Sequence, residues 1–229
     1  MIIRRKLISL LIIAAGALSC APLAMSQAGT SVNEGDWPNI HGDAAARRYS
    51  PLDQINPDNV GDLEIAWNFS TLHFGIGTDY VNPSTPLEVG GVLYANIGST
   101  RNVVALDATN GQVLWLWRYQ EGDRFDEAPR KGAGRGVSYW SDGDSARIID
   151  VSPGYQLVSL DAETGIPDPN FGDNGLVDLY VGVRNGEDDR FAYPDIGLSA
   201  PPFVMNDVIV IGAAHRTGGR PRSKFNTKG

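Results

Sequence analysis

Cysteine and histidine are scarce in this 229-residue chain, which has one Cys and three His. A single Cys excludes a disulfide framework, an internal Cys-x-x-Cys redox motif and a Cys-rich zinc site. His41, His73 and His215 are scattered without the spacing of metal ligands, so we expect no histidine-based metal centre. The net charge of −8 argues against a nucleic-acid partner, because an acidic surface repels a phosphate backbone.

Sustained helical periodicity is also missing from the chain. The 27 glycines and 14 prolines are typical of a chain divided into many short segments rather than of a helical bundle. Hydrophobic residues make up 42% of the sequence, which is enough to bury a core and excludes a wholly disordered chain. The length allows one or two domains.

The first 28 residues have the features of a secretory signal peptide. Arg4, Arg5 and Lys6 precede an apolar run from Leu7 to Leu18, and small residues follow up to Ala28. The apolar run is shorter than the roughly 20 residues that a membrane span needs, although an uncleaved membrane-anchoring helix remains an alternative. We therefore expect the protein to be exported.

Cys20 offers a second interpretation of the same segment. Ala17-Leu18-Ser19-Cys20 resembles a bacterial lipoprotein cleavage box, although Ala17 stands where Leu is usual. Lipid attachment at Cys20 is thus an alternative to simple cleavage, and both routes lead to export.

Two segments of the remaining chain repeat each other: Val104–Gly111 recurs as Val158–Gly165. Each ends in a predicted tight turn, where an Asp can bond its own backbone and a Gly accepts a positive φ. Short strands with turns that return at this even spacing indicate blades of a β-propeller, an all-β fold. A β-sandwich with two similar turns by coincidence is the alternative.

The repeat predicts where the blades lie. Leu63–Phe69 alternates apolar and polar residues and reads as a strand without companions, as expected of a strand that closes a propeller by completing its last blade. A propeller needs at least four blades, so we expect residues 29–213 to form an incomplete one. We expect a blade at 82–119, a second at 134–180 and the opening of a third at 199–213.

Nine segments follow one another in a recognisable order and spacing: His41-Gly42-Asp43, Arg48 to Leu52, Gln54-Ile55-Asn56, Asn59 to Leu63 with Ala66-Trp67, Thr85-Pro86-Leu87, Gly91 to Tyr94, Val104 to Gly111 with Leu114-Trp115, Arg135 to Tyr139 and Ala200-Pro201-Pro202. They resemble the N-terminal part of the PQQ-dependent quinoprotein dehydrogenases, and more the sugar and polyol type (glucose or quinate dehydrogenase) than the methanol type. The resemblance runs from about Asp36 to Gly212. It implies a quinoprotein-type propeller of eight four-stranded blades, with pyrroloquinoline quinone (PQQ) across the central channel beside a Ca²⁺ ion.

The resemblance assigns two cofactor-binding residues. Arg135, in Gly134-Arg135-Gly136, matches an arginine that contacts the oxygens of PQQ, and a forked cationic donor suits that role. Ser199 matches a hydroxyl residue that hydrogen-bonds PQQ. Thr85 and Ser138 are further channel-facing candidates to which we assign no role.

The chain also departs from the family pattern. No Cys follows Cys20, whereas methanol-type enzymes carry an adjacent disulfide near the cofactor; this favours the sugar-type branch. Ala214 and Thr217 stand where a small hydroxyl residue and an acidic metal ligand are expected, so no Ca²⁺ ligand is evident. The stacking Trp and the catalytic Asp of the family have no counterpart among these residues, and we expect no catalytic residue in this chain.

Residues 214–229 form a basic tail, with Arg216, Arg220, Arg222, Lys224 and Lys228 and no acidic residue. We expect this tail to be disordered and to lie outside the family pattern, as in a truncated or frame-shifted gene product.

The leading hypothesis is thus part of a periplasmic PQQ-dependent dehydrogenase, inactive as this fragment. The resemblance implies a sugar, polyol or alcohol substrate and a respiratory electron acceptor, either a quinone or cytochrome c. The alternative is a non-catalytic propeller scaffold, similar to an outer-membrane assembly lipoprotein.

Overall fold

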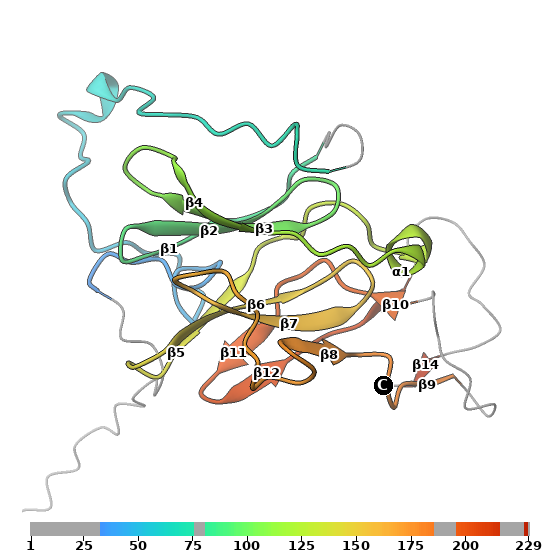
Figure 1. Cartoon of the computed structure of the whole chain (residues 1–229). Coiled ribbons are helices and arrows are strands. Elements are labelled where there is room, and N and C mark those ends of the chain that lie inside the picture. The colour runs from blue at the N-terminus through green and yellow to red at the C-terminus, as the bar shows by residue number, and fades with distance from the viewer. Residues whose placement is uncertain (1–32, 76–80, 186–195, 216–226, 229) are drawn as a thin grey trace, which may run out of the picture.

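The chain folds into successive antiparallel sheets with very little helix (Figure 1). The computed structural model describes residues 33–75, 81–185, 196–215 and 227–228. The first sheet has the order β1-β2-β3-β4, in which each strand pairs with the next one along the chain. Its strands are β1 (Leu87–Val89), β2 (Val92–Ile97), β3 (Asn102–Asp107) and β4 (Val113–Trp117).

The second sheet repeats this plan in the order β5-β6-β7-β8 and stacks beside the first (Figure 1). Its strands are β5 (Ser138–Ser141), β6 (Ala146–Val151), β7 (Gln156–Asp161) and β8 (Leu176–Asp178). A third unit begins with the hairpin of β11 (Phe203–Met205) and β12 (Val208–Val210), and β11 lies against β5. These are two complete blades and the opening of a third, as the sequence predicted.

Short elements connect these units. The helices among the described residues are η1 (Val60–Asp62) and α1 (Asp123–Glu127), and none of them is long or apolar enough to cross a membrane. Two minor pairings join β10 (Ile196–Gly197) to β13 (Ala214–His215) and β9 (Arg184–Asn185) to β14 (Thr227–Lys228). The absence of helical periodicity in the sequence agrees with this all-β architecture.

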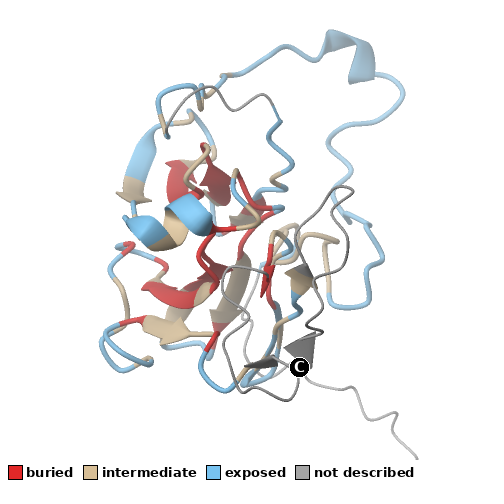
Figure 2. Ribbon diagram, turned by 90° about the vertical axis from the view of Figure 1, so that its right-hand side faces the viewer, coloured by how far each residue is buried: buried red, intermediate tan, exposed pale blue. Residues whose placement is uncertain are grey.

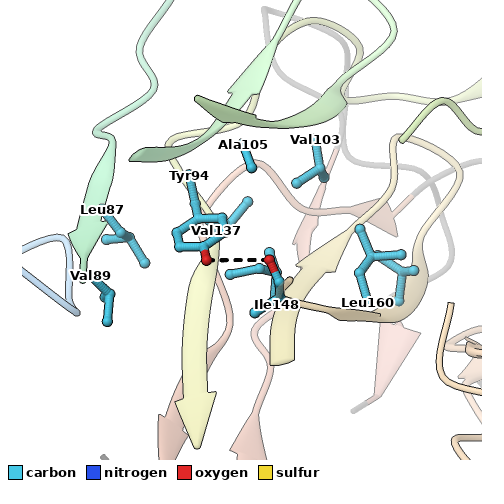
Figure 3. Close-up of a cluster of buried hydrophobic side chains, with 10 residues drawn as sticks. Leu87, Val89, Tyr94, Val103, Ala105, Val137, Ile148 and Leu160 are labelled. Atoms are coloured by element: carbon cyan, nitrogen blue, oxygen red, sulfur yellow. Dashed lines mark hydrogen bonds between the residues drawn. The ribbon is translucent and has the colours of Figure 1, made fainter. Parts of the chain in front are cut away.

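The main core lies between the two complete sheets, which face each other through apolar side chains (Figure 3). Tyr94 of the first sheet reaches across it, and its hydroxyl donates to the carbonyl of Ala162 at 3.2 Å. Buried residues gather at the centre of the molecule, whereas the segment that carries η1 is largely exposed (Figure 2). The buried members of this cluster are Leu87, Val89, Tyr94, Val103, Ala105, Val137, Ile148, Val158, Leu160 and Ala162.

The contacts between neighbouring units repeat with the same spacing as the sequence. Trp67 donates its indole N–H to the carbonyl of Ala108 at 3.0 Å, and Trp115 donates to Ala162, the repeat equivalent of Ala108, also at 3.0 Å. Each indole covers the glycine that ends the adjacent Asp-containing turn. Gly165 shows why that residue must be glycine: its φ is +70°, and a Cβ there would lie 2.5 Å from Cε3 of Trp115. Both tryptophans are therefore packing residues between neighbouring units.

The predicted closing strand has no partner among the described strands. Leu63–Phe69 is extended, but it makes no ladder with any described strand, and Ile65 is 85% exposed. Trp67 nevertheless docks on the first sheet. The extended backbone without companions agrees with the sequence pattern, and its pairing in a last blade stays a prediction.

Some expectations fall outside the described residues. The signal peptide of residues 1–28, including Cys20, and most of the basic tail lie there. The described residues of the tail are paired: Ala214–His215 form β13 and Thr227–Lys228 form β14.

Candidate functional site

The segments that precede the first strand of each unit are joined to one another by main-chain hydrogen bonds. Thr85, just before β1, donates its amide to the carbonyl of Arg135 at 3.0 Å. Arg135, just before β5, donates its amide to the carbonyl of Ser199 at 2.8 Å, and Ser199 precedes β11. The structure thus brings together three residues that belong to three different units of the repeat. These residues, which we call the inner row, include both predicted cofactor-binding residues.

The side chains of the inner row are available for a ligand. Arg135 is exposed, and within the described ranges its guanidinium has no hydrogen bond or ion pair to the protein. Ser199 is half-buried, and Thr85 is exposed. An exposed guanidinium and a hydroxyl group on neighbouring backbone segments can bind a carboxylate or a quinone oxygen through charge-assisted hydrogen bonds. This donor set fits the rim of PQQ, which bears carboxylates and quinone oxygens.

Glycine next to Arg135 allows the inner row to form. Gly136 has a φ of +139°, which L side chains rarely adopt, and a Cβ there would lie 2.9 Å from the carbonyl oxygen of Thr85. Ser138, the remaining candidate, donates its hydroxyl to the carbonyl of Pro202 in the third unit. Its hydroxyl therefore joins two blades, and we assign it no contact with a cofactor.

The opening block of the sequence lies against the same strands. A cavity of about 220 Å³ is lined on one side by residues 38–46 and on the other by Val137–Tyr139 and Ala200–Val204. His41 and Asp43 belong to its lining. The block that carries part of the family resemblance is thereby placed beside the inner row, although the sequence alone predicted no contact between them.

Beneath the inner row lies a buried polar cluster that sequence reasoning missed. Asn96 of β2 donates its side-chain amide to the Asp150 carboxylate of β6 at 2.7 Å, and both residues are almost fully buried. Burial raises the pKa of Asp150 to about 6, although the nearby Arg101 guanidinium and the Asn96 hydrogen bond oppose this shift. Burial also lowers the pKa of Arg101. A signal was available: Asn96 and Asp150 occupy the same repeat position, each directly after apolar residues of its strand.

Among the described residues, no group of three or more His, Cys, Asp or Glu side chains is placed to hold a metal ion. Asp142 is an exposed turn residue whose carboxylate accepts the amides of Asp144 and Ser145 at 3.0 and 2.7 Å. We therefore assign no metal ligand among the described residues.

The family follows from comparison with known proteins. Residues 37–227 match the family model described as the PQQ β-propeller domain of glucose/ethanol/alcohol dehydrogenases. The chain belongs to this family. The match confirms the resemblance seen in the sequence, the propeller class of fold, and membership of a dehydrogenase family associated with PQQ.

Curated and solved members of this PQQ family agree with the assignment. The large subunit of glycerol dehydrogenase from Gluconobacter thailandicus is 30% identical over 204 residues, which are 84% of this chain and 26% of that protein. Quinoprotein glucose dehydrogenase A from Acinetobacter calcoaceticus is 28% identical over 82% of this chain and 25% of its own length. The chain thus spans about a quarter of the curated relatives it matches.

The crystal structure of quinohemoprotein alcohol dehydrogenase from Comamonas testosteroni superposes with a TM-score of 0.58 at 28% identity. The superposition covers 79% of this chain and 23% of that one. A europium-containing methanol dehydrogenase matches with a TM-score of 0.54 at 25% identity, covering 80% of this chain and 28% of that enzyme. The PQQ-family fold therefore accommodates a metal ion in at least that relative.

Proposed function

We propose that this chain forms the opening blades of a PQQ-binding propeller in a dehydrogenase that oxidises a hydroxyl group of a sugar, polyol or alcohol. The observation that carries the proposal is the inner row. In it the Arg135 amide donates to the Ser199 carbonyl at 2.8 Å, while the guanidinium of Arg135 is exposed and has no hydrogen bond or ion pair to another described residue. Membership of the PQQ family and the names of the glycerol and glucose dehydrogenase relatives support the class of substrate.

In this proposal the chain binds and orients the cofactor. When bound, PQQ supplies the acceptor for the two electrons removed from the substrate. Arg135 binds an anionic oxygen at the cofactor rim, where a planar charged fork fixes both position and orientation. Ser199 donates a hydrogen bond to a neighbouring rim oxygen. Because the main chain of Ser199 is bonded to that of Arg135, the backbones that carry the two donors are held side by side.

The proposal leaves the chemical step to residues other than those described. We assign no general base and no Ca²⁺ ligand to this chain, so binding of PQQ, rather than turnover, is its expected property. The basic and apolar sequence at residues 1–28 supports export to the periplasm, where the electrons would pass to a quinone or to cytochrome c.

A titration tests the proposal directly. The 229-residue chain is titrated with PQQ, with and without Ca²⁺, while the absorbance and fluorescence of PQQ are followed. We expect saturable binding that Arg135→Ala weakens by about 10- to 100-fold, since a hydrogen bond to a charged group contributes ~1.5–3 kcal/mol.

Arg118→Ala is the matched control for this titration. Arg118 is an exposed arginine just after β4 whose guanidinium lies over the Phe74 ring, 5.5 Å from its centroid, and not at the inner row. It should leave the affinity for PQQ unchanged. Absence of binding with and without Ca²⁺ would overturn the proposal and favour a non-catalytic propeller scaffold. An equal loss of PQQ affinity in Arg135→Ala and Arg118→Ala would mean that only the net charge of the protein matters. That result would also overturn the role of Arg135.

A further inference from the structure

Arg101 connects the first blade to both segments of the candidate cofactor site. It lies in the turn between β2 and β3 and is only 3% exposed. Its φ of +54° is unusual for a residue with a side chain. The side chain extends from the first blade to the segments that precede Arg135 and Ser199.

All three guanidinium nitrogens donate to main-chain carbonyls of other segments. Nη2 donates to Arg130 at 2.7 Å, and Nε donates to Gly132 at 3.2 Å, both in the segment that leads to Arg135. Nη1 donates to Leu198, directly before Ser199, at 2.6 Å and also to Val151 of β6 at 2.8 Å. One side chain therefore holds the approaches to both Arg135 and Ser199.

The packing around Arg101 leaves little room for these segments to move. A Cβ on Gly134, the residue before Arg135, would lie 2.5 Å from Oδ1 of Asn96 and 3.3 Å from Cδ of Arg101. Asp150 supplies a buried negative charge near the guanidinium, which offsets part of the cost of burying Arg101. The loop that carries Arg135 thus rests directly on the buried polar cluster.

The repeat shows that this arrangement is particular to the first blade. The equivalent of Arg101 in the second blade is Tyr155, which also has a positive φ, of +62°. Its hydroxyl donates to the carbonyl of Gly212 at 3.2 Å. Both residues contact the following unit, but only arginine has enough donors to hold several segments at once.

We propose that Arg101 is a positioning residue for the cofactor site, which sets the separation and orientation of Arg135 and Ser199. The proposal rests on the proposed function, because it assumes that the inner row binds PQQ. It predicts that loss of Arg101 alters how PQQ is held, beyond any effect on the stability of the fold.

The test compares Arg101→Gln with Arg135→Ala in the full 229-residue chain. Each variant is measured well below its own unfolding temperature, and both the PQQ affinity and the absorption spectrum of bound PQQ at saturation are recorded. We expect Arg101→Gln to weaken binding by about tenfold or more, since it removes several charge-assisted hydrogen bonds. We also expect it to shift the bound spectrum toward that of free PQQ. Tyr155→Phe, the control at the equivalent repeat position, should change neither quantity.

The outcomes separate the two proposals. If Arg135→Ala does not weaken binding, the proposed function fails. If Arg135→Ala weakens binding but Arg101→Gln lowers only the unfolding temperature and leaves the affinity and the bound spectrum unchanged, the positioning role of Arg101 fails. Should Arg101→Gln not fold, Arg101→Lys takes its place. Lysine keeps the charge but cannot reach the same acceptors, so a PQQ affinity below that of the wild type supports the role. Full wild-type affinity and spectrum in Arg101→Lys would refute it.

Discussion

Substitution of Gly165 by alanine tests the contact that joins the two complete blades. Gly165 has a φ of +70°, and placing an L residue in this region costs about 1–2 kcal/mol. The new methyl group would also lie 2.5 Å from the Trp115 indole. Displacing a packed aromatic ring adds about 1–3 kcal/mol. Together these effects predict a loss of about 2–5 kcal/mol in the free energy of unfolding.

Gly143→Ala is a matched control for this substitution. Gly143 has a φ of +95°, but a Cβ there meets nothing within 4 Å. It therefore reports the backbone strain without the steric clash. Urea-induced unfolding followed by tryptophan fluorescence gives both free energies by linear extrapolation. We expect Gly165→Ala to lower the free energy of unfolding by at least about 1 kcal/mol more than Gly143→Ala does.

A double-mutant cycle assigns that difference to the indole. In a Trp115→Leu background the extra cost of Gly165→Ala should largely disappear, because the ring that it displaces is gone. If Gly165→Ala destabilised the protein no more than Gly143→Ala, docking of the tryptophan on the repeat glycine would not be what joins these blades.

Further predictions concern buried and paired charges. Because the pKa of Asp150 is raised from 3.8 to about 6 in the folded state, the folded protein binds more protons than the unfolded one between these values. Stability should then fall by about 3 kcal/mol as pH rises from about 4 to about 6, and Asp150→Asn should remove this component in pH-dependent urea unfolding. The opposite sign applies to Asp178, whose pKa is lowered by hydrogen bonds from Arg124 at 2.6 and 2.9 Å. Its contribution is present above about pH 4 and is lost as pH falls; Arg124→Met should lower stability at pH 7 by about 1 kcal/mol, since the pair is partly exposed, and by less at pH 3.

Each of these charge predictions has a contradicting result. An unchanged slope between pH 4 and 6 in Asp150→Asn would mean that this carboxyl group does not titrate there. Equal destabilisation by Arg124→Met at both pH values would mean that the methylene groups of Arg124, and not its charge, stabilise the protein.

The repeated part of the fold could be predicted from the sequence because its signals are local. An Asp that begins a turn and a Gly that ends it specify the chain reversal within one short segment, and the same pattern returns in the next blade. The Asp107 carboxylate accepts the amide of Thr109 at 2.8 Å, and the Asp161 carboxylate accepts the amide of Glu163, the repeat equivalent of Thr109, at 3.2 Å. The alternation in Leu63–Phe69 predicted an extended segment with one apolar face, but a ladder also needs a partner strand, which alternation does not specify.

The candidate site was only partly predictable. Motif resemblance pointed to Arg135 and Ser199, and the structure places them together, while their contact with PQQ stays a prediction. Arg101 could not be found in this way, because its acceptors include the carbonyl of Leu198, 97 residues away. Such a contact depends on how three units pack, and no pattern near Arg101 in the sequence specifies it.

The central claim is that the inner row is the part of this chain that binds PQQ. Amide chemical-shift mapping during a PQQ titration tests it most directly, using the ¹H–¹⁵N resonances of the 229-residue chain. We predict that Thr85, Arg135 and Ser199 shift together and saturate at the same concentration, while Thr109 and Gly143, in turns away from the inner row, do not move. Shifts confined to other segments, or no shifts at all, would contradict the account.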